Sequence, residues 1–144
     1  MKLLLSEVLQ KAHNAKTKAE KINILRKNKS DALVSVFIIN FDESVVPVVP
    51  LGEDVPYRKN EAPAGTEHSK LEHEARILFH FFKGGSNVGQ NKREMMFVQM
   101  LEGLSAGEAE VLCLAKDKKL GKRWKITKAT VTEAFPQIVW GNRS

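Results

Sequence analysis

The chain has 144 residues and a mass of 16.2 kDa, the usual size of one domain with its own hydrophobic core. Hydrophobic residues make up 42% and charged residues 28% of the sequence, which excludes collagen-like, low-complexity and wholly disordered chains. The single cysteine cannot form an internal disulfide, which is typical of a reducing compartment. We therefore expect one folded domain over residues 1–144.

The amino-terminal segment MKLLLSEVL becomes polar at Ser6 and Glu7. Its apolar run is shorter than that of a signal peptide and far shorter than the ~20 residues that span a bilayer. We therefore expect a cytoplasmic protein with no membrane partner. The net charge of +6 and the sequence pI of about 9.5 favour polyanionic partners such as nucleic acid.

The positive charge is unevenly distributed. Residues 1–29 contain eight Lys and Arg against two acids, residues 30–83 five against nine, and residues 84–144 ten against six. Seven of the last ten cations fall within a short stretch and define a cationic cluster: Lys116, Lys118, Lys119, Lys122, Arg123, Lys125 and Lys128.

Two short helices are predicted at the start of the chain. Apolar residues recur at helical spacing over residues 4–12, which predicts the first. A second apolar set at residues 22–25 follows Thr17, which can cap a helix and form a capping box with Glu20.

A third helix is predicted after Ser30, which offers another N-cap. The β-branched residues between 32 and 39 suggest a strand, but the spacing from Leu33 to Phe37 favours a helix.

A long proline-rich loop is predicted over about residues 42–65. It contains four of the five prolines, Pro47, Pro50, Pro56 and Pro63. Such a loop either carries function or lies over a hydrophobic surface, and its apolar residues favour the second: Val45, Val46, Val48, Val49 and Leu51.

Four helices are predicted in the second half. The first runs from residue 66 to the glycines at 84 and 85, and the next covers about residues 89–102. A capping box at Ser105 begins a helix that should end near residues 120–121, and Thr127 caps a short helix that Pro136 ends. The expected fold class is all-α, a single compact bundle of about seven short helices.

No pattern indicates catalysis or a bound cofactor. His73 and Glu74 begin like the zinc motif HExxH, but Ile77 stands where the second histidine belongs, so we expect no metal. The glycine-rich segment 84–92 lacks the Lys-Ser/Thr pair of a phosphate-binding loop. Cys113 lies among packing residues with no designated base, so a structural thiol is favoured over a nucleophile.

The cationic cluster can be a solvated surface or a set of phosphate contacts. It surrounds a glycine turn and the start of a helix, where free N–H groups add positive partial charge. The turn over residues 27–30, Lys-Asn-Lys-Ser, has the same arrangement. Trp124 within the cluster can stack on a base or anchor the segment to the core, and large aromatic residues usually pack.

Two blocks of the chain resemble the amino-terminal α-helical DNA-binding domain of ATP-dependent DNA ligases of the T-even bacteriophage type. Residues 4–44 contain an I-L-x-K-N-K turn, and residues 111–136 contain Asp117 and Gly121 in a D-x-x-x-G turn before a closing AFP. The chain is also similar to small proteins of T-even-like phages of cyanobacteria. The resemblance implies a DNA ligase N-terminal-domain-like fold and a phage-encoded protein.

This resemblance implies DNA binding without catalysis. The ligases transfer nucleotides from a K-x-D-G lysine on a separate domain, whereas the nearest string here, residues 29–32, reads KSDA. The ligase domain grips duplex DNA through phosphates and helix starts. The expected DNA-binding residues are therefore Lys27, Lys29, Lys118, Lys119, Gly121, Lys122, Arg123, Lys125 and Lys128.

Two hypotheses follow. The leading one is a non-catalytic, largely sequence-independent protein that binds the phosphate backbone of double-stranded DNA. The alternative is a protein-interaction adaptor of a phage replication, transcription or virion assembly, with the acidic middle and the proline-rich loop as its docking surface. An enzyme ranks third, because no acid, base and nucleophile come together in the sequence.

Overall fold

A computed structural model describes residues 4–48, 71–82 and 87–141. The first third contains α1 (Leu5–Asn14), α2 (Lys18–Lys27) and α3 (Asp31–Phe41). After α4 (Leu71–Glu74) come the 3-10 helix η1 (Ala75–Phe81), α5 (Gln90–Gly103) and α6 (Ala106–Lys116), then the 3-10 turn η2 (Leu120–Lys122) and α7 (Lys128–Ala134). The described residues are mostly helical and contain no β-strand, which confirms the all-α prediction.

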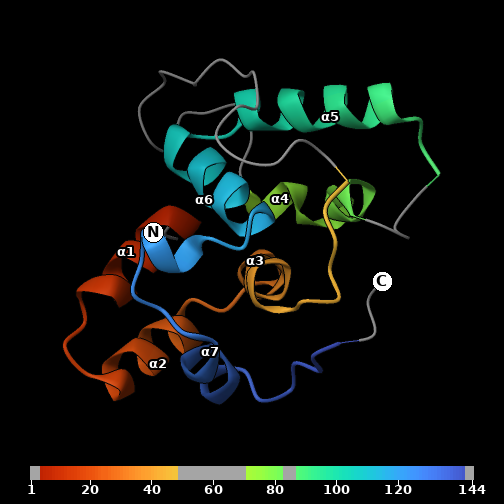
Figure 1. The fold of residues 1–144 in the computed structure, drawn as a ribbon. Coiled ribbons are helices and arrows are strands. Elements are labelled where there is room, and N and C mark those ends of the chain that lie inside the picture. Colours follow the sequence, from red (N-terminus) through yellow and green to blue (C-terminus); the bar gives the residue numbers. More distant parts are fainter. Residues whose placement is uncertain (1–3, 49–70, 83–86, 142–144) are drawn as a thin grey trace.

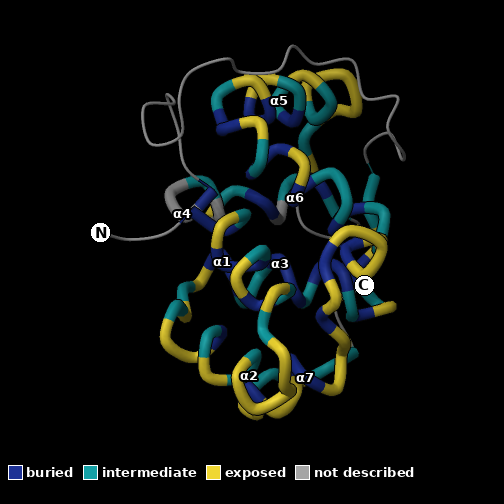
Figure 2. The backbone as a smooth tube through the Cα atoms, turned by 90° about the vertical axis from the view of Figure 1, so that its left-hand side faces the viewer, coloured by how far each residue is buried: buried dark blue, intermediate teal, exposed yellow. Residues whose placement is uncertain are grey.

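The helices are arranged around α3, which Figure 1 shows almost end-on at the centre of the molecule. α3 contacts α4, α6 and η1, and α5 lies across α6 on one side. On the other side α2 packs against both α1 and α7, so the first and last thirds of the chain lie side by side. In Figure 2 exposed residues lie along the outer surfaces of α2, α5 and α7 and in several of the connecting segments.

Four side chains predicted to cap helices do so. The hydroxyl oxygens of Thr17, Ser30, Ser105 and Thr127 each accept a hydrogen bond from the backbone N–H three residues on, over 3.1–3.2 Å. Each bond satisfies one of the N–H groups that a helix start leaves without an intrahelical partner. The starts of α2, α3, α6 and α7 therefore follow from local sequence.

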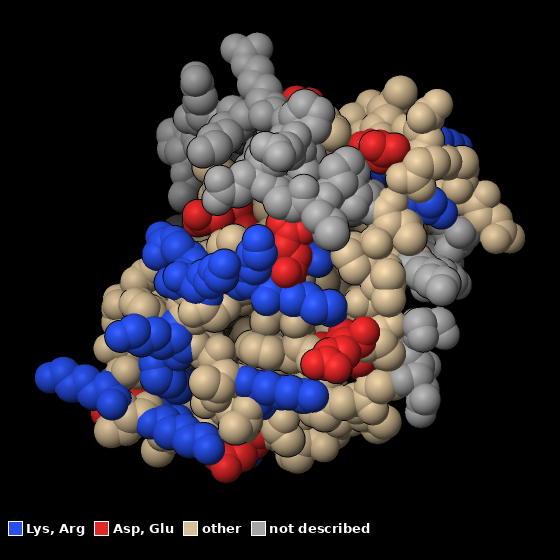
Figure 3. Space-filling model, in the orientation of Figure 1, with Lys and Arg blue, Asp and Glu red and all other residues tan. Residues whose placement is uncertain are grey.

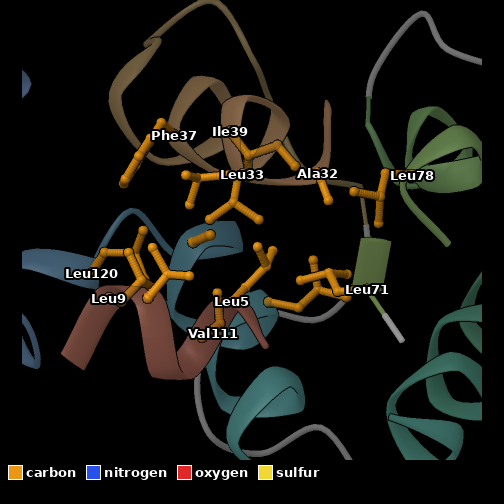
Figure 4. Packing of buried hydrophobic residues seen from close by; sticks show 14 of the residues in the cluster. Leu5, Leu9, Ala32, Leu33, Phe37, Ile39, Leu71, Leu78, Val111 and Leu120 are labelled. Atoms are coloured by element: carbon orange, nitrogen blue, oxygen red, sulfur yellow. The ribbon is translucent and has the colours of Figure 1, made fainter. Parts of the chain in front are cut away.

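The core extends through all the large helices, and Figure 4 shows side chains of α1, α3 and α6 meeting in it. Leu9, Leu33, Phe37 and Val111 are each at most 1% exposed. α3 is apolar around most of its circumference, because neighbouring elements cover it on several sides. This packing explains why its β-branched residues form a helix rather than a strand.

Glu108 joins two helix starts within this core. Its carboxylate accepts hydrogen bonds from the backbone N–H groups of Leu5 over 3.1 Å and Leu71 over 2.9 Å, the first residues of α1 and α4. The predicted capping box at Ser105 is therefore only half formed, because the Glu108 carboxylate binds two other helices. With 1% exposure, Glu108 is a buried carboxylate satisfied by N–H groups of helix starts, where negative charge is favoured.

One predicted helix changes type along its length, and one helix boundary was predicted wrongly. The helix expected from residue 66 continues after Glu74 as the 3-10 helix η1, and its expected start and its glycine end lie outside the described residues. The helix expected to reach residues 120–121 ends at Lys116, because the chain reverses at Lys118. Short-range periodicity cannot show either change.

Only residues 42–48 of the predicted loop are described. Val45 is buried, whereas Val46 is 40% exposed, so the expected coverage of a hydrophobic surface holds for the first valine and fails for the second. Pro47 forms an isolated antiparallel bridge with Phe82, and the N–H of Val48 donates to the carbonyl of Phe81 over 2.9 Å. This part of the loop is tied to the end of η1.

Candidate functional site

Some cations of the amino-terminal third cap helix ends. The ammonium of Lys21 donates to the carbonyls of Ala12 over 2.9 Å and His13 over 3.3 Å, in the last turn of α1. The guanidinium of Arg26 donates to the carbonyls of Glu133 over 2.8 Å and Ala134 over 3.1 Å, at the end of α7. Positive charge is favoured at these ends because the last carbonyls have no intrahelical donor.

Lys118 has the same role at the end of α3. Its ammonium donates to the carbonyls of Ile39 over 2.7 Å and Asp42 over 2.8 Å. Lys118 was predicted to contact phosphate, but its side chain is partly buried and its charge is directed at helix carbonyls. Partial burial lowers the pKa of Lys118 below its ordinary value, against the opposing attraction of Asp42 and Glu43.

The backbone of Lys118 also ends α6. Its φ of +60° is in the left-handed region that normally favours glycine. The N–H of Lys118 donates to the carbonyl of Ala115 over 2.9 Å, and that of Lys119 to Leu114 over 2.8 Å, the two bonds of a Schellman motif. Lys118 therefore caps the carboxyl end of α6 with its backbone and the carboxyl end of α3 with its side chain.

Lys116 is also an interior residue. Its side chain is 0% exposed, and its ammonium lies 2.7 Å from a carboxylate oxygen of Asp117 and 6.0 Å from the centre of the Phe97 ring. The first part of the cationic cluster, residues 116–118, is thus part of the packed structure.

The rest of the cluster lies on a segment that is fixed to α1 and α3. Trp124 is 2% exposed and its indole N–H donates to the Gln10 side chain over 3.2 Å, so the predicted anchoring is confirmed. The N–H of Lys125 donates to Nδ1 of His13 over 2.9 Å, and the N–H of Leu120 to the Asn40 side chain over 3.1 Å. These contacts hold residues 119–128 against the bundle while their cationic side chains face outward.

The contacts with α1 bring two further cations to the same surface. Lys11 lines a shallow groove between α1 and α6 together with Arg123 and Trp124, and Lys16 follows His13 in the α1–α2 turn. Lysines and arginines gather over α1, the segment after α6 and the α2–α7 pair in Figure 3. We define the basic face by its exposed members, which are Lys11, Lys16, Lys119, Lys122, Arg123, Lys125 and Lys128. Sequence reasoning missed Lys11 and Lys16, because only tertiary contacts place them there.

The turn at Lys27 and Lys29 is exposed, but it lies apart from the 119–125 segment. Arg26, which directly precedes it, binds the carboxyl end of α7, whereas the 119–127 segment leads into the amino end of that helix. The two predicted turns are therefore separated by the length of α7. Gly121 is exposed, and a Cβ added there would meet nothing within 4 Å, so the fold itself does not require a glycine.

Two cations of the basic face lie over tryptophan rings. The guanidinium of Arg123 lies 5.1 Å from the centre of the Trp124 ring, and the ammonium of Lys128 lies 5.0 Å from that of Trp140. Arg123 is also 3.6 Å from a carboxylate oxygen of Glu110. These contacts hold both charges at the surface without removing them from solvent.

The geometry defines a helical protein with a fixed, exposed basic face. By sequence, residues 8–122 match the model of a family of unknown function, DUF6433, and the chain belongs to this family. No curated protein and no solved structure matches the chain. Within the described residues, no helix is long and apolar enough to cross a membrane, and no three His, Cys, Asp or Glu side chains are grouped to hold a metal ion.

Proposed function

We propose that this protein binds double-stranded DNA without catalysis and largely independently of sequence, through the basic face. The observation that carries the proposal is the gathering of seven exposed cations from two separate parts of the chain, residues 11–16 and 119–128, on a surface that the contacts of Trp124 and Lys125 with α1 hold in place. Preformed positive surfaces bind phosphates with little loss of backbone entropy.

The composition of the basic face favours phosphate contacts over base readout. Six of its seven residues are lysines, which act as flexible point charges, and only Arg123 has the planar fork that reads guanine edges. Such a set neutralises phosphates but carries little sequence information.

The tryptophans favour a duplex over a single strand. Proteins that bind single strands usually stack bases on exposed aromatic rings. Trp124 is 2% exposed and Arg123 lies over its ring, while Lys128 lies over the ring of Trp140. Neither ring is an open platform for a base.

The resemblance of residues 4–44 and 111–136 to the DNA-binding domain of phage ligases supports the same function, and it is the only support for a phage-encoded protein acting in the host cytoplasm. The proposed DNA-contacting residues no longer include Lys118, and they now include Lys11 and Lys16. Lys27 and Lys29 stay as peripheral contacts, because they lie beyond the far end of α7.

A titration of a short DNA duplex at several salt concentrations tests the proposal. The slope of log K on log salt is expected between about −3 and −6, since each phosphate contact contributes about −0.9 and the face has seven cations. A single strand of the same sequence should bind more weakly. Lys92→Gln, which removes an exposed charge from α5, serves as the control and should leave the slope unchanged. Absent or salt-independent binding would overturn the proposal and favour the adaptor.

A further inference from the structure

One arginine of the basic face is already paired within the protein. The Nε of Arg123 lies 3.6 Å from Oε1 of Glu110, and the two side chains are 49% and 48% exposed. Both charges therefore remain accessible to solvent and to an approaching ligand. The Trp124 ring beneath the guanidinium fixes where this arginine is presented.

The position of the pair makes Glu110 a competitor for any bound anion. Glu110, Arg123 and Lys11 line the same groove between α1 and α6, at the edge of the basic face. A carboxylate and a phosphate present similar oxygen pairs to a guanidinium, so Arg123 binds one of them at full strength but not both. A duplex that reaches Arg123 must first displace Glu110.

We infer that Glu110 acts as an internal substitute for a DNA phosphate, occupying Arg123 in the free protein and weakening duplex binding until it is displaced. This inference rests on the proposed function of the basic face. An exposed ion pair is weak enough for a DNA phosphate to replace its carboxylate. The loss of such a pair changes the binding constant for duplex DNA by at most a few-fold. Glu110 therefore tunes the affinity of the face without blocking it.

Glu110→Gln tests the exchange, with Glu94→Gln on α5 as a control that removes the same charge at a distance. Glu110→Gln should bind duplex about two- to fivefold more tightly than the wild type at about 0.1 M salt, and Glu94→Gln should bind equally. Because Glu110 is exposed, the thermal unfolding of the variant should match that of the wild type.

A double-mutant cycle with Arg123→Gln shows whether the effect passes through the arginine. The gain from Glu110→Gln should disappear in the Arg123→Gln background. A gain that persists there would mean a general charge effect and would overturn the inference, as would equal affinities of Glu110→Gln and Glu94→Gln. In both cases wild-type binding is intact, whereas absent wild-type binding refutes the proposed function itself.

Discussion

The two halves of the cationic cluster use the same residue types in opposite ways. The inward half consists of Lys116 and Lys118, whose side chains point into the protein. Lys116 lies beside Asp117, and Lys118 lies against the carbonyl end of α3. The outward half consists of the cations of residues 119–128, whose side chains face solvent on a segment anchored by Trp124. The change occurs within one residue, at the Schellman turn that ends α6.

The difference shows that a helix end decides what a lysine does. The last carbonyls of α1, α3 and α7 lack intrahelical donors, and Lys21, Lys118 and Arg26 supply them. A positive net charge therefore contains one part that caps helix ends and another part that makes no such contact. Only the second part bears on nucleic acid.

The largest expected effect concerns the outward half. Charge reversal at Lys119, Lys122 and Arg123 should weaken duplex binding by 10²- to 10³-fold at about 0.1 M salt and reduce the salt slope by up to about three, because three phosphate contacts are lost. The loss should be the same for unrelated DNA sequences, since phosphate contacts read no bases. Fluorescence anisotropy with two duplexes of different sequence measures both quantities.

The same triple variant should unfold within a few degrees of the wild type, because all three side chains are exposed. An unchanged affinity in this folded variant would show that the outward half is only a solvated surface.

The inward half should respond in stability rather than in binding. Lys118→Met removes the ammonium from the carbonyls of Ile39 and Asp42 and should cost about 2 kcal/mol of unfolding free energy. Lys118→Gly loses the same bonds but relieves the left-handed backbone, so it should cost about 1 kcal/mol less than Lys118→Met. Urea unfolding measures both, and the exposed Lys119→Met is the matched control with almost no expected change. Equal stability of Lys118→Met and the wild type would contradict the capping role.

A smaller effect is expected at the turn beyond α7. Lys27→Gln combined with Lys29→Gln should weaken duplex binding by at most about tenfold, because these lysines lie at the far end of that helix from the 119–125 segment. The same titration measures this loss. A loss as large as that of the triple variant would place the centre of the DNA-binding surface between the two turns.

The parts of the fold that depend on local chemistry were predictable from sequence. Thr17, Ser30, Ser105 and Thr127 cap helices in the structure because each has a hydroxyl directly before a helical pattern. The inward direction of the Lys118 side chain was not predictable, since the carbonyls that accept its hydrogen bonds are 79 and 76 residues away in sequence.

The same limit applies to the remaining contacts. Glu108 has the spacing of a capping box, but its carboxylate binds Leu5 and Leu71, whose positions only the folded chain determines. Lys11 and Lys16 join the basic face through the contact of α1 with Trp124 and Lys125. Sequence therefore indicates how much charge the chain carries, and tertiary structure decides which charges are exposed.

The smallest expected effect is a pH dependence that belongs to the inward half alone. Partial burial lowers the pKa of Lys118 in the folded protein below the 10.5 of an ordinary lysine, while Asp42 and Glu43 limit the shift. At a pH between the lowered pKa and 10.5, Lys118 binds more protons in the unfolded chain than in the folded protein. The contribution of Lys118 to the free energy of unfolding therefore rises with pH in this window. Urea unfolding of the wild type and Lys118→Met between neutral pH and this window measures the difference. The gap between the two proteins should widen as pH rises, and a gap that narrows would show that the charged ammonium is favoured by folding.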